Sequence, residues 1–215
     1  PGTKHRLNTT PHEALDLSLV IPVYNEEDNI APLVGEIRAA LAPTGLDYEV
    51  LFIDDGSRDS SFACLQELAA ADPRIVAIRF RRNYGQTAAF AAGFDHARGA
   101  VIVTLDADRQ NDPADIPALL AKLNEGYDVV NGWRQNRQDN LVRRFPSRVA
   151  NWLIAETSGV HLKDRGCSLR AFRHEVVEDM NLYGELHRFI PELVNFAGFS
   201  MAEVPVNHRA RVAGA

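Results

Sequence analysis

The feature that most constrains the fold is the regular alternation of short apolar runs with longer amphipathic segments between residues 17 and 131. The runs have the length of strands, while the segments between them repeat apolar residues at helical spacing. This alternation predicts an α/β domain in which a mostly parallel central sheet is flanked by helices. We expect strands at 17–21, 48–53, 74–80, 100–105 and 128–131, and helices at 28–41, 60–71, 86–97 and 113–123.

The pattern is weaker after residue 132. We expect helices at 151–158 and 176–182, an apolar stretch at 190–196 and a late strand at 201–206. No internal repeat, low-complexity tract or interdomain linker divides the chain. The 215 residues are therefore predicted to form one domain over 17–215, preceded by a flexible polar segment over 1–16.

Two of the predicted strands end in paired carboxylates. Asp54 and Asp55 follow the second strand, and Asp106 and Asp108 follow the fourth. Like charges crowded at the end of a buried strand are costly unless a cation meets them. A single Asp-x-Asp is more often a solvated strand end, but parallel sheets bind their ligands beyond the carboxyl ends of the strands. Two acidic strand ends at that edge favour a nucleotide with its divalent ion.

The distribution of charge and cysteine narrows the classes of partner. The net charge is −6, but residues 1–132 carry 11 Lys and Arg against 20 Asp and Glu, whereas residues 133–215 carry 12 against 9. An acidic first part suits a metal ion, and a basic second part suits a phosphorylated partner or an anionic membrane surface. No basic stripe is interleaved with aromatic residues, which argues against nucleic acid. The two cysteines form neither a disulfide framework nor a zinc pattern, which favours a reducing cytosolic setting.

Seven motifs follow one another along the chain: VIPVYNE (20–26), DDGS (54–57), RNYGQ (82–86), DADRQ (106–110), DRGCSLRAFR (164–173), GELHRFIP (184–191) and VNHRARVAG (206–214). Together they resemble the inverting glycosyltransferases of family 2, which have the GT-A fold, and among them the polyprenyl-phosphate (dolichol- or undecaprenyl-phosphate) glycosyltransferases. The resemblance covers residues 17–214. The segment 164–173 is most similar to bacterial enzymes that attach aminoarabinose-type or other sugars to undecaprenyl phosphate.

The resemblance implies an enzyme with a single Rossmann-like GT-A domain. Such an enzyme moves a sugar from a nucleotide-diphosphate sugar, UDP- or GDP-linked, to a polyprenyl phosphate with the help of Mg²⁺ or Mn²⁺. It works at the cytoplasmic face of the membrane. Family members usually continue into amphipathic or membrane-spanning helices, a C-terminal region that we expect this chain to lack. A homo-oligomer is compatible with the resemblance, which leaves the oligomeric state open.

The DADRQ motif offers three side chains with hard oxygen atoms that suit Mg²⁺ or Mn²⁺: Asp106, Asp108 and Gln110. The resemblance implies that Asp108 and Gln110 bind the ion most directly, and that Asp106 contacts the ion or the ribose of the donor. Arg109 stands where family members commonly carry Leu. Its side chain either adds positive charge near the ion or points to solvent.

The resemblance also places the donor nucleotide at the ends of the first two strands. Pro22, Tyr24 and Glu26 correspond to the wall of the base pocket. Asp54 and Asp55 correspond to the acidic edge that accepts a hydrogen bond from the base. Structural roles are the alternative, because Pro22 ends a strand and Glu26 favours the N-terminus of the following helix.

Arg134, which follows the last strand of the alternating region, is the candidate for binding the diphosphate. We expect the catalytic group to comprise Asp106, Asp108, Arg134 and Asp164. Asp164 is the fallback base if the acceptor is a hydroxyl, because a hydroxyl must lose a proton during attack. A phosphate acceptor is already anionic at neutral pH, and Asp164 then orients Arg170 or Arg173.

The abundance of arginine after residue 133 favours a phosphate acceptor, since a phosphate needs cations to hold it more than a base to activate it. The predicted acceptor-binding residues are Arg143, Arg144, Arg148, Arg170, Arg173, His187, Arg188, His208 and Arg209. A solvated basic face is the alternative for the arginines, and a packed, hydrogen-bonded histidine is the alternative for His187.

Other functions explain less of the chain. A family 2 enzyme that acts on a sugar hydroxyl in polysaccharide or glycolipid synthesis is the nearest alternative. An Asp-x-Asp phosphatase would carry Thr where Gln110 stands, and a dinucleotide oxidoreductase would have a Gly-x-Gly-x-x-Gly loop in place of residues 22–25. A receiver-like Mg²⁺-binding module, which is not an enzyme, leaves the Arg-rich second part unexplained.

Overall fold

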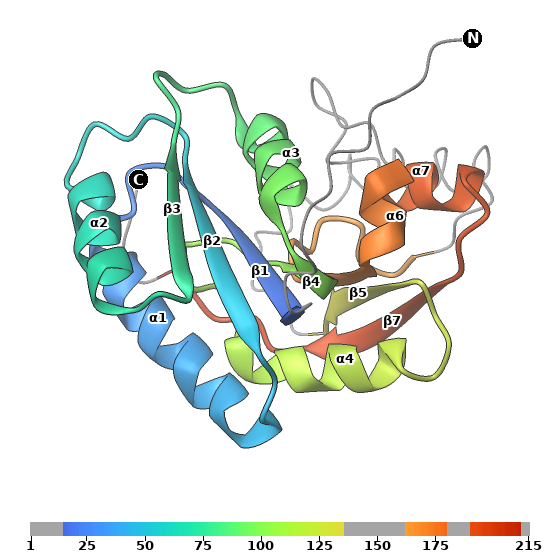
Figure 1. Ribbon diagram of the computed structural model, residues 1–215. Helices are drawn as coiled ribbons and strands as arrows, with labels where there is room; N and C mark the ends of the chain where they lie inside the picture. The colour runs from blue at the N-terminus through green and yellow to red at the C-terminus, as the bar shows by residue number, and fades with distance from the viewer. Residues whose placement is uncertain (1–14, 136–161, 180–189, 212–215) are drawn as a thin grey trace, which may run out of the picture.

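The computed structural model describes residues 15–135, 162–179 and 190–211. These residues form a seven-stranded sheet in the order β3-β2-β1-β4-β6-β5-β7, with helices packed on both faces (Figure 1). The strands are β1 (Leu15–Val23), β2 (Tyr48–Asp54), β3 (Ile75–Arg79), β4 (Gly99–Thr104), β5 (Val129–Arg134), β6 (Arg170–Arg173) and β7 (Met201–Val206). The predicted α/β class with a mostly parallel sheet is confirmed.

One strand runs against the others. β1 pairs in parallel with β2 and β4, β2 with β3, and β5 with β7, whereas β6 lies antiparallel between β4 and β5. The sequence does not predict β6, because this four-residue strand begins and ends with Arg and has only Ala171 and Phe172 between them. Its register places Arg170 beside Thr104, at the carboxyl end of β4, and Arg173 beside Val101.

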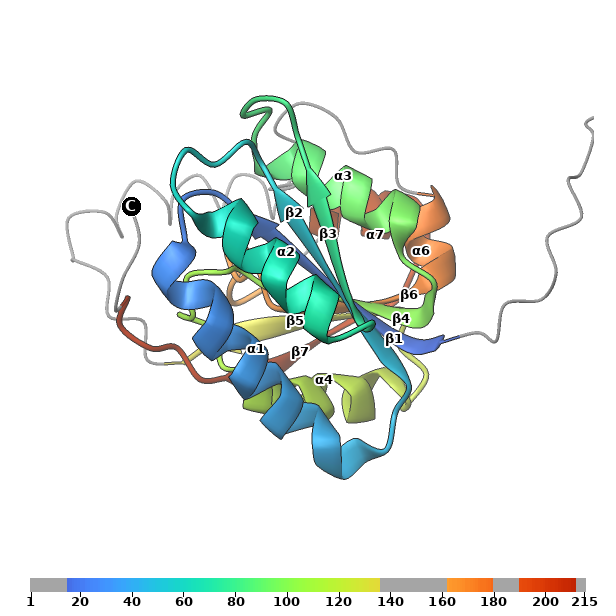
Figure 2. The ribbon, with the colours of Figure 1, turned by 60° about the vertical axis from the view of Figure 1, so that its left-hand side comes forward.

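Different helices cover the two faces of the sheet (Figure 2). One face carries α1 (Glu27–Leu41), α2 (Ser61–Ala71) and α4 (Ile116–Leu123), and the other carries α3 (Gln86–His96), α6 (His174–Asp179) and α7 (Ile190–Phe196). Successive residues of β1 divide between the two cores: Leu19 and Ile21 pack in the first, and Val20 packs in the second. Because both faces of the central strands are buried, these strands are continuous apolar runs in the sequence.

The predicted elements of the alternating region are all present, with small shifts at their ends. β1 begins at Leu15, so the last two residues of the predicted N-terminal segment belong to the sheet. The helix expected from residue 113 begins at Ile116, after a short 3-10 turn over Pro113–Asp115. The predictions for 151–158 and 180–182 lie outside the described residues. No helix within the described ranges is long and apolar enough to cross a membrane.

The parallel strands bring the loops that follow β1, β2 and β4 to one edge of the sheet. The turn after β2 contains Gly56, whose φ is 72°. A Cβ at this position would lie 2.6 Å from the backbone carbonyl carbon of Arg82, so glycine is needed for the turn to pack on the loop after β3. The acidic strand ends therefore share this edge with the residues that precede α3.

Candidate active site

A cavity of about 360 Å³ lies at the carboxyl ends of β1, β2 and β4, and its volume falls in the usual range of small-molecule sites. Its wall is formed by the three strand ends and by the segment that leads into α3: Pro22, Val23, Tyr24, Glu26, Asp55, Asn83, Gly85, Gln86, Asp106, Ala107 and Asp108. The structure thus brings together carboxylates from two strand ends at one site, as the sequence predicts from the carboxyl ends of parallel strands.

Asp106 is held at the back of this site by two polar partners. Its Oδ1 accepts a hydrogen bond of 2.8 Å from Nε2 of Gln86, and its carboxylate also bonds the side chain of Ser168. Burial raises the pKa of the Asp106 carboxyl, and the nearby charge of Asp108 raises it further. Arg134 acts in the opposite direction. The site therefore holds negative charge in surroundings that a bound cation would relieve.

Asp108 and Gln110 belong to one tight turn. The backbone N–H of Gln110 donates to Oδ1 of Asp108 over 3.0 Å, and Arg109 between them has a φ of 60°. This left-handed conformation is uncommon for a residue other than glycine. The turn gives Asp108 a fixed place on the wall of the cavity.

The oxygen atoms at this turn fit a hard divalent cation. Within residues 15–135, 162–179 and 190–211, no three His, Cys, Asp or Glu side chains lie close enough together to hold a metal ion by themselves. Asp106 and Asp108 on the cavity wall suit an ion such as Mg²⁺, which usually takes one or two carboxylates from a protein and completes its shell with phosphate oxygens and water. Gln110 belongs to the same turn but is not part of the described cavity wall. The residues present therefore suit an ion that arrives with a phosphorylated ligand.

Asp54 and Asp55 have different surroundings although they are adjacent. Asp55 lines the cavity, and its two oxygens accept the backbone N–H groups of Tyr84 and Gly85 over 2.7 and 2.9 Å. Asp54 is fully buried; its Oδ1 accepts the N–H of Ser57 over 3.0 Å, and its Oδ2 lies 3.2 Å from Nε of Arg79. Asp54 is thus not part of the described cavity wall, and its carboxylate instead holds the turn after β2.

The other wall of the cavity is formed by the residues after β1. Tyr24 is 38% exposed, so its ring is available to a ligand. Glu26 is buried, and its Oε2 accepts Nδ2 of Asn29 over 2.6 Å. Its Oε1 lies 2.5 Å from Nη2 of Arg211, which comes from the far end of the chain. Glu26 therefore links the start of α1 to the segment that follows β7.

Arg134 and Asp164 form a bidentate ion pair. Nε and Nη2 of Arg134 donate to the two oxygens of Asp164 over 2.6 and 2.9 Å. Both side chains are largely buried, so solvent screens the pair little. Asp164 thus orients Arg134 directly, and its charge also acts on Arg170, one of the two arginines that it is predicted to orient. Burial raises the pKa of the neighbouring Cys167 thiol to about 11, so this thiol stays neutral at physiological pH.

A sequence profile described as Glycosyl transferase family 2 matches residues 18–180. The chain belongs to glycosyl transferase family 2. This confirms the family that the motifs predict. Among its relatives are undecaprenyl-phosphate 4-deoxy-4-formamido-L-arabinose transferases from Klebsiella pneumoniae, 47% identical over 199 residues, and from Shewanella sediminis, 48% identical over 200 residues. The match covers 92% of this chain in both cases, and the chain spans about 60% of the length of these relatives.

Solved structures show the same fold. Glucosyl-3-phosphoglycerate synthase from Mycobacterium tuberculosis, crystallised with Mn²⁺, UDP and phosphoglyceric acid, has a TM-score of 0.69 with 20% sequence identity. The likeness covers 98% of this chain and 78% of that chain. The same enzyme with phosphoglyceric acid alone has a TM-score of 0.68 with 22% identity. The predicted GT-A fold is therefore confirmed for this family 2 domain.

The structure separates the residues predicted to bind the acceptor. Arg143, Arg144, Arg148, His187 and Arg188 lie outside the described residues. Arg170 is 6% exposed and donates Nη2 to the carbonyl oxygen of Arg165 over 2.7 Å, and its charge acts on Asp106. Arg170 is therefore buried within electrostatic reach of Asp106 in this family 2 site.

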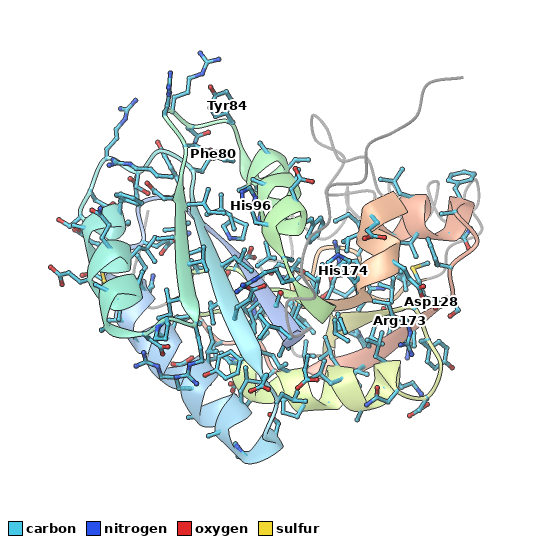
Figure 3. The ribbon with its side chains drawn as sticks, viewed as in Figure 1. Phe80, Tyr84, His96, Asp128, Arg173 and His174 are labelled. Carbon is cyan, nitrogen blue, oxygen red and sulfur yellow. The ribbon has the colours of Figure 1, made fainter. Side chains whose placement is uncertain are left out.

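Arg173 does not belong to the site. Its Nε and Nη2 donate over 3.1 Å to the carbonyl oxygens of Tyr127 and Leu123, and Asp128 lies beside it (Figure 3). These contacts are at the C-terminal end of α4, which is at the other end of the sheet. Three positions separate Arg173 from Arg170 on one strand, so their side chains also point to opposite faces. The prediction that Arg173 binds the acceptor is wrong.

His208 and Arg209 lie along the turn that carries the candidate ion ligands. His208 forms an isolated β-bridge with Asn111, and the N–H of Arg209 donates to the carbonyl oxygen of Gln110 over 2.8 Å. Arg109, for which the sequence leaves two orientations open, follows neither of them. Its guanidinium bonds Glu36 on α1.

Sequence reasoning assigns no individual role to several residues that shape the site. Gln86, Ser168 and Arg211 each lie within a quoted motif, and that position is the signal from which their roles could be inferred. Glu36 has no such signal, because it lies outside the quoted motifs and is one of four charged residues in α1. Its role is visible only from the contacts of its side chain.

Proposed function

We propose that this family 2 domain transfers a sugar from a nucleotide-diphosphate sugar, UDP- or GDP-linked, to undecaprenyl phosphate or a similar polyprenyl phosphate, with inversion at C1. The sugar of the named relatives, 4-deoxy-4-formamido-L-arabinose, is the first candidate. The observation that carries the proposal is the cavity in which Tyr24, Asp55 and the pair Asp106 and Asp108 face one another at the carboxyl ends of parallel strands.

The donor is expected to lie across this cavity. Its base packs against Pro22 and Tyr24, with Asp55 at the edge, while its diphosphate extends toward Asp108. Asp106, Asp108 and Gln110 would hold Mg²⁺ or Mn²⁺. When bound, the ion offsets the negative charge that develops on the leaving diphosphate. Asp54 supports this pocket indirectly, because its carboxylate accepts a hydrogen bond from the N–H of Ser57 in the turn after β2.

Arg134 is the second cation for the diphosphate. The bidentate pair with Asp164 fixes the plane of its guanidinium, so the group does not have to be ordered when the donor binds. Its charge also acts on the Asp106 carboxyl, opposing the rise of that pKa, and this supports a role for Arg134 near the proposed diphosphate site. Asp164 thus acts on the donor through Arg134.

The acceptor phosphate oxygen attacks C1 of the sugar from the face opposite to the diphosphate. The new C1–O bond forms as the bond from C1 to the diphosphate oxygen breaks, and the electron pair leaves with the nucleoside diphosphate. A phosphate monoester is largely a dianion at neutral pH, so this step requires no general base. Both oxygens of Asp164 are engaged by Arg134, which supports a phosphate acceptor over a hydroxyl that would need this base.

The acceptor would be held by the basic residues of the second part of the chain, among them Arg143, Arg144, Arg148, His187 and Arg188. These side chains would also attract the anionic surface of the membrane that contains the lipid. We therefore place the reaction at the cytoplasmic face of the membrane.

The test is a transfer assay with purified protein, a panel of UDP- and GDP-sugars, Mn²⁺ and undecaprenyl phosphate in mixed micelles, read by mass spectrometry and by NMR of the anomeric proton. We expect an undecaprenyl phosphate sugar with the inverted anomer from at least one donor. The Asp108→Ala variant, with an unchanged fold by circular dichroism, should give no product. Transfer only to sugar hydroxyls, or product with the retained anomer, would contradict the proposal.

A further inference from the structure

A single carboxylate on α1 connects the turn that carries the candidate ion ligands to the segment that follows β7. Oε1 of Glu36 accepts hydrogen bonds from Nη2 and Nε of Arg109 over 2.5 and 3.2 Å. Its Oε2 accepts Nη1 of Arg209 over 2.8 Å. The side chains of Glu36 and Arg109 are each 24% exposed, so the pairs are partly shielded from solvent.

Arg109 occupies the position where the turn is most demanding. It lies between Asp108 and Gln110, and its φ of 60° is rarely adopted by residues with a Cβ. Such a conformation is unfavourable for a residue with a Cβ and persists when surrounding contacts determine it. Glu36 supplies such a contact, because it holds the Arg109 side chain by two hydrogen bonds.

Arg209 ties the segment after β7 to the same turn. Its backbone N–H donates to the carbonyl oxygen of Gln110 over 2.8 Å, and its Nη2 lies 2.6 Å from Oδ2 of Asp112. Asn207, two residues earlier, bonds Asp115 through its backbone and its side chain over 2.7 and 2.9 Å. The segment 207–209 thus lies along residues 110–115, with Glu36 joining the two arginines at one end.

We propose that Glu36 is a positioning residue for the ion site: by holding Arg109 and Arg209 together, it sets the arrangement in which Asp108 and Gln110 present their oxygens. Glu36 is not part of the described cavity wall, so it acts through Arg109 rather than on the donor. This proposal rests on the proposed function, since it assumes that Asp108 and Gln110 bind the ion that accompanies the nucleotide. Loss of an outer partner of a metal ligand typically weakens metal binding by about 10- to 100-fold.

The test measures how strongly Mn²⁺ enhances nucleotide binding. The dissociation constant of UDP or GDP, whichever binds the wild type more tightly, is determined by calorimetry with Mn²⁺ and again with EDTA. The ratio of the two constants isolates the ion site from the base pocket. For Glu36→Gln we expect this ratio to fall about tenfold, with the constant in EDTA unchanged. Glu67→Gln, a charge removal on the exposed face of α2, is the matched control and should keep the wild-type ratio.

A double-mutant cycle separates positioning from a general loss of stability. Arg109→Met should lower the ratio to the same extent, and adding Glu36→Gln to it should have no further effect, because the second change acts through the first. If Glu36→Gln does not fold, Arg109→Met alone decides. A wild-type ratio in either single variant, or an equal loss of affinity in Mn²⁺ and in EDTA, would overturn the proposed role of Glu36.

The Asp108→Asn variant distinguishes this proposal from the proposed function. Asp108 is a proposed ligand, so its loss should abolish the enhancement by Mn²⁺. If Asp108→Asn keeps the enhancement, the proposed ion site is wrong and the role of Glu36 falls with it. If Asp108→Asn loses the enhancement while Glu36→Gln retains it, only the positioning role is wrong.

Discussion

Asp106 carries charge in surroundings that disfavour it. Burial and the neighbouring Asp108 raise the pKa of its carboxyl, and the arginines behind it compensate this only in part. Perturbed carboxyl groups of this kind gather at functional sites, where a ligand supplies the missing compensation. The same residue is therefore expected to serve the donor and to weaken the ligand-free protein.

Asp106→Asn should stabilise the ligand-free protein at neutral pH. The pKa of this carboxyl is higher in the folded protein than in the unfolded chain, where it is about 4. The free energy of unfolding of the wild type therefore falls as the pH rises from the unfolded pKa through the folded pKa, because the carboxyl ionises more readily in the unfolded chain. The variant avoids this loss, so its advantage in the free energy of unfolding should grow from pH 4 to pH 7. Urea unfolding at several pH values measures it, and an advantage that is the same at every pH would contradict the assigned cause.

Arg134→Lys tests whether the guanidinium serves the diphosphate. Lysine keeps the charge but cannot reproduce the two parallel bonds to Asp164, so its position is no longer fixed. We expect the variant to bind UDP or GDP about tenfold more weakly, a loss of about 1.4 kcal/mol, and to bind the free nucleoside as the wild type does. Equal losses for nucleotide and nucleoside in calorimetry would show that Arg134 acts on the fold of the pocket instead.

At the scale of elements, the antiparallel strand β6 decides which basic residues reach the site. It carries Arg170 to the carboxyl end of β4 and Arg173 to the other end, where Arg173 bonds the carbonyl oxygens of Leu123, the last residue of α4, and of Tyr127. Both arginines belong to the DRGCSLRAFR motif, so the sequence predicts the same role, acceptor binding, for both. Only the register of β6 and the alternation of its side chains separate them.

Arg173→Met should therefore affect stability and not the reaction. Methionine keeps the apolar length of the side chain but removes the donors to two carbonyl oxygens and the favourable charge at a helix C-terminus, at a cost on the order of 1–2 kcal/mol. The KM for undecaprenyl phosphate should remain within twofold of the wild type. A large rise in this KM, with little change in the urea midpoint, would return Arg173 to the acceptor site.

Most of the fold is predictable from the sequence because its central strands are buried on both faces. Continuous apolar runs mark β1, β2 and β4, and the helices between them repeat apolar residues at the spacing that their packing requires. β6 is the exception, since arginines at both ends hide its two apolar residues. Pairing with the neighbouring strands, rather than its own residue pattern, determines that so short a segment forms a strand.

At the scale of the whole molecule, the candidate site is predictable only in outline. The rule that ligands bind beyond the carboxyl ends of parallel strands places the acidic pairs at one edge. This rule does not distinguish Asp55, on the cavity wall, from the buried Asp54. The difference depends on which of the two carboxylates accepts the hydrogen bond from the turn after β2. Asp164 pairs with Arg134, 30 residues away along the chain, and Glu36 pairs with two arginines that lie 73 and 173 residues away. These pairings therefore require the packed fold.

The central claim is that the carboxyl ends of β1, β2 and β4 hold a donor nucleotide through one divalent ion. Anomalous diffraction at the manganese edge, from crystals grown with Mn²⁺ and UDP or GDP, tests it most directly. We predict a single strong peak beside Asp108 and Gln110, in contact with the diphosphate, with the base against Tyr24 and Asp55. A peak elsewhere, or a bound nucleotide with no manganese at this turn, would contradict the claim.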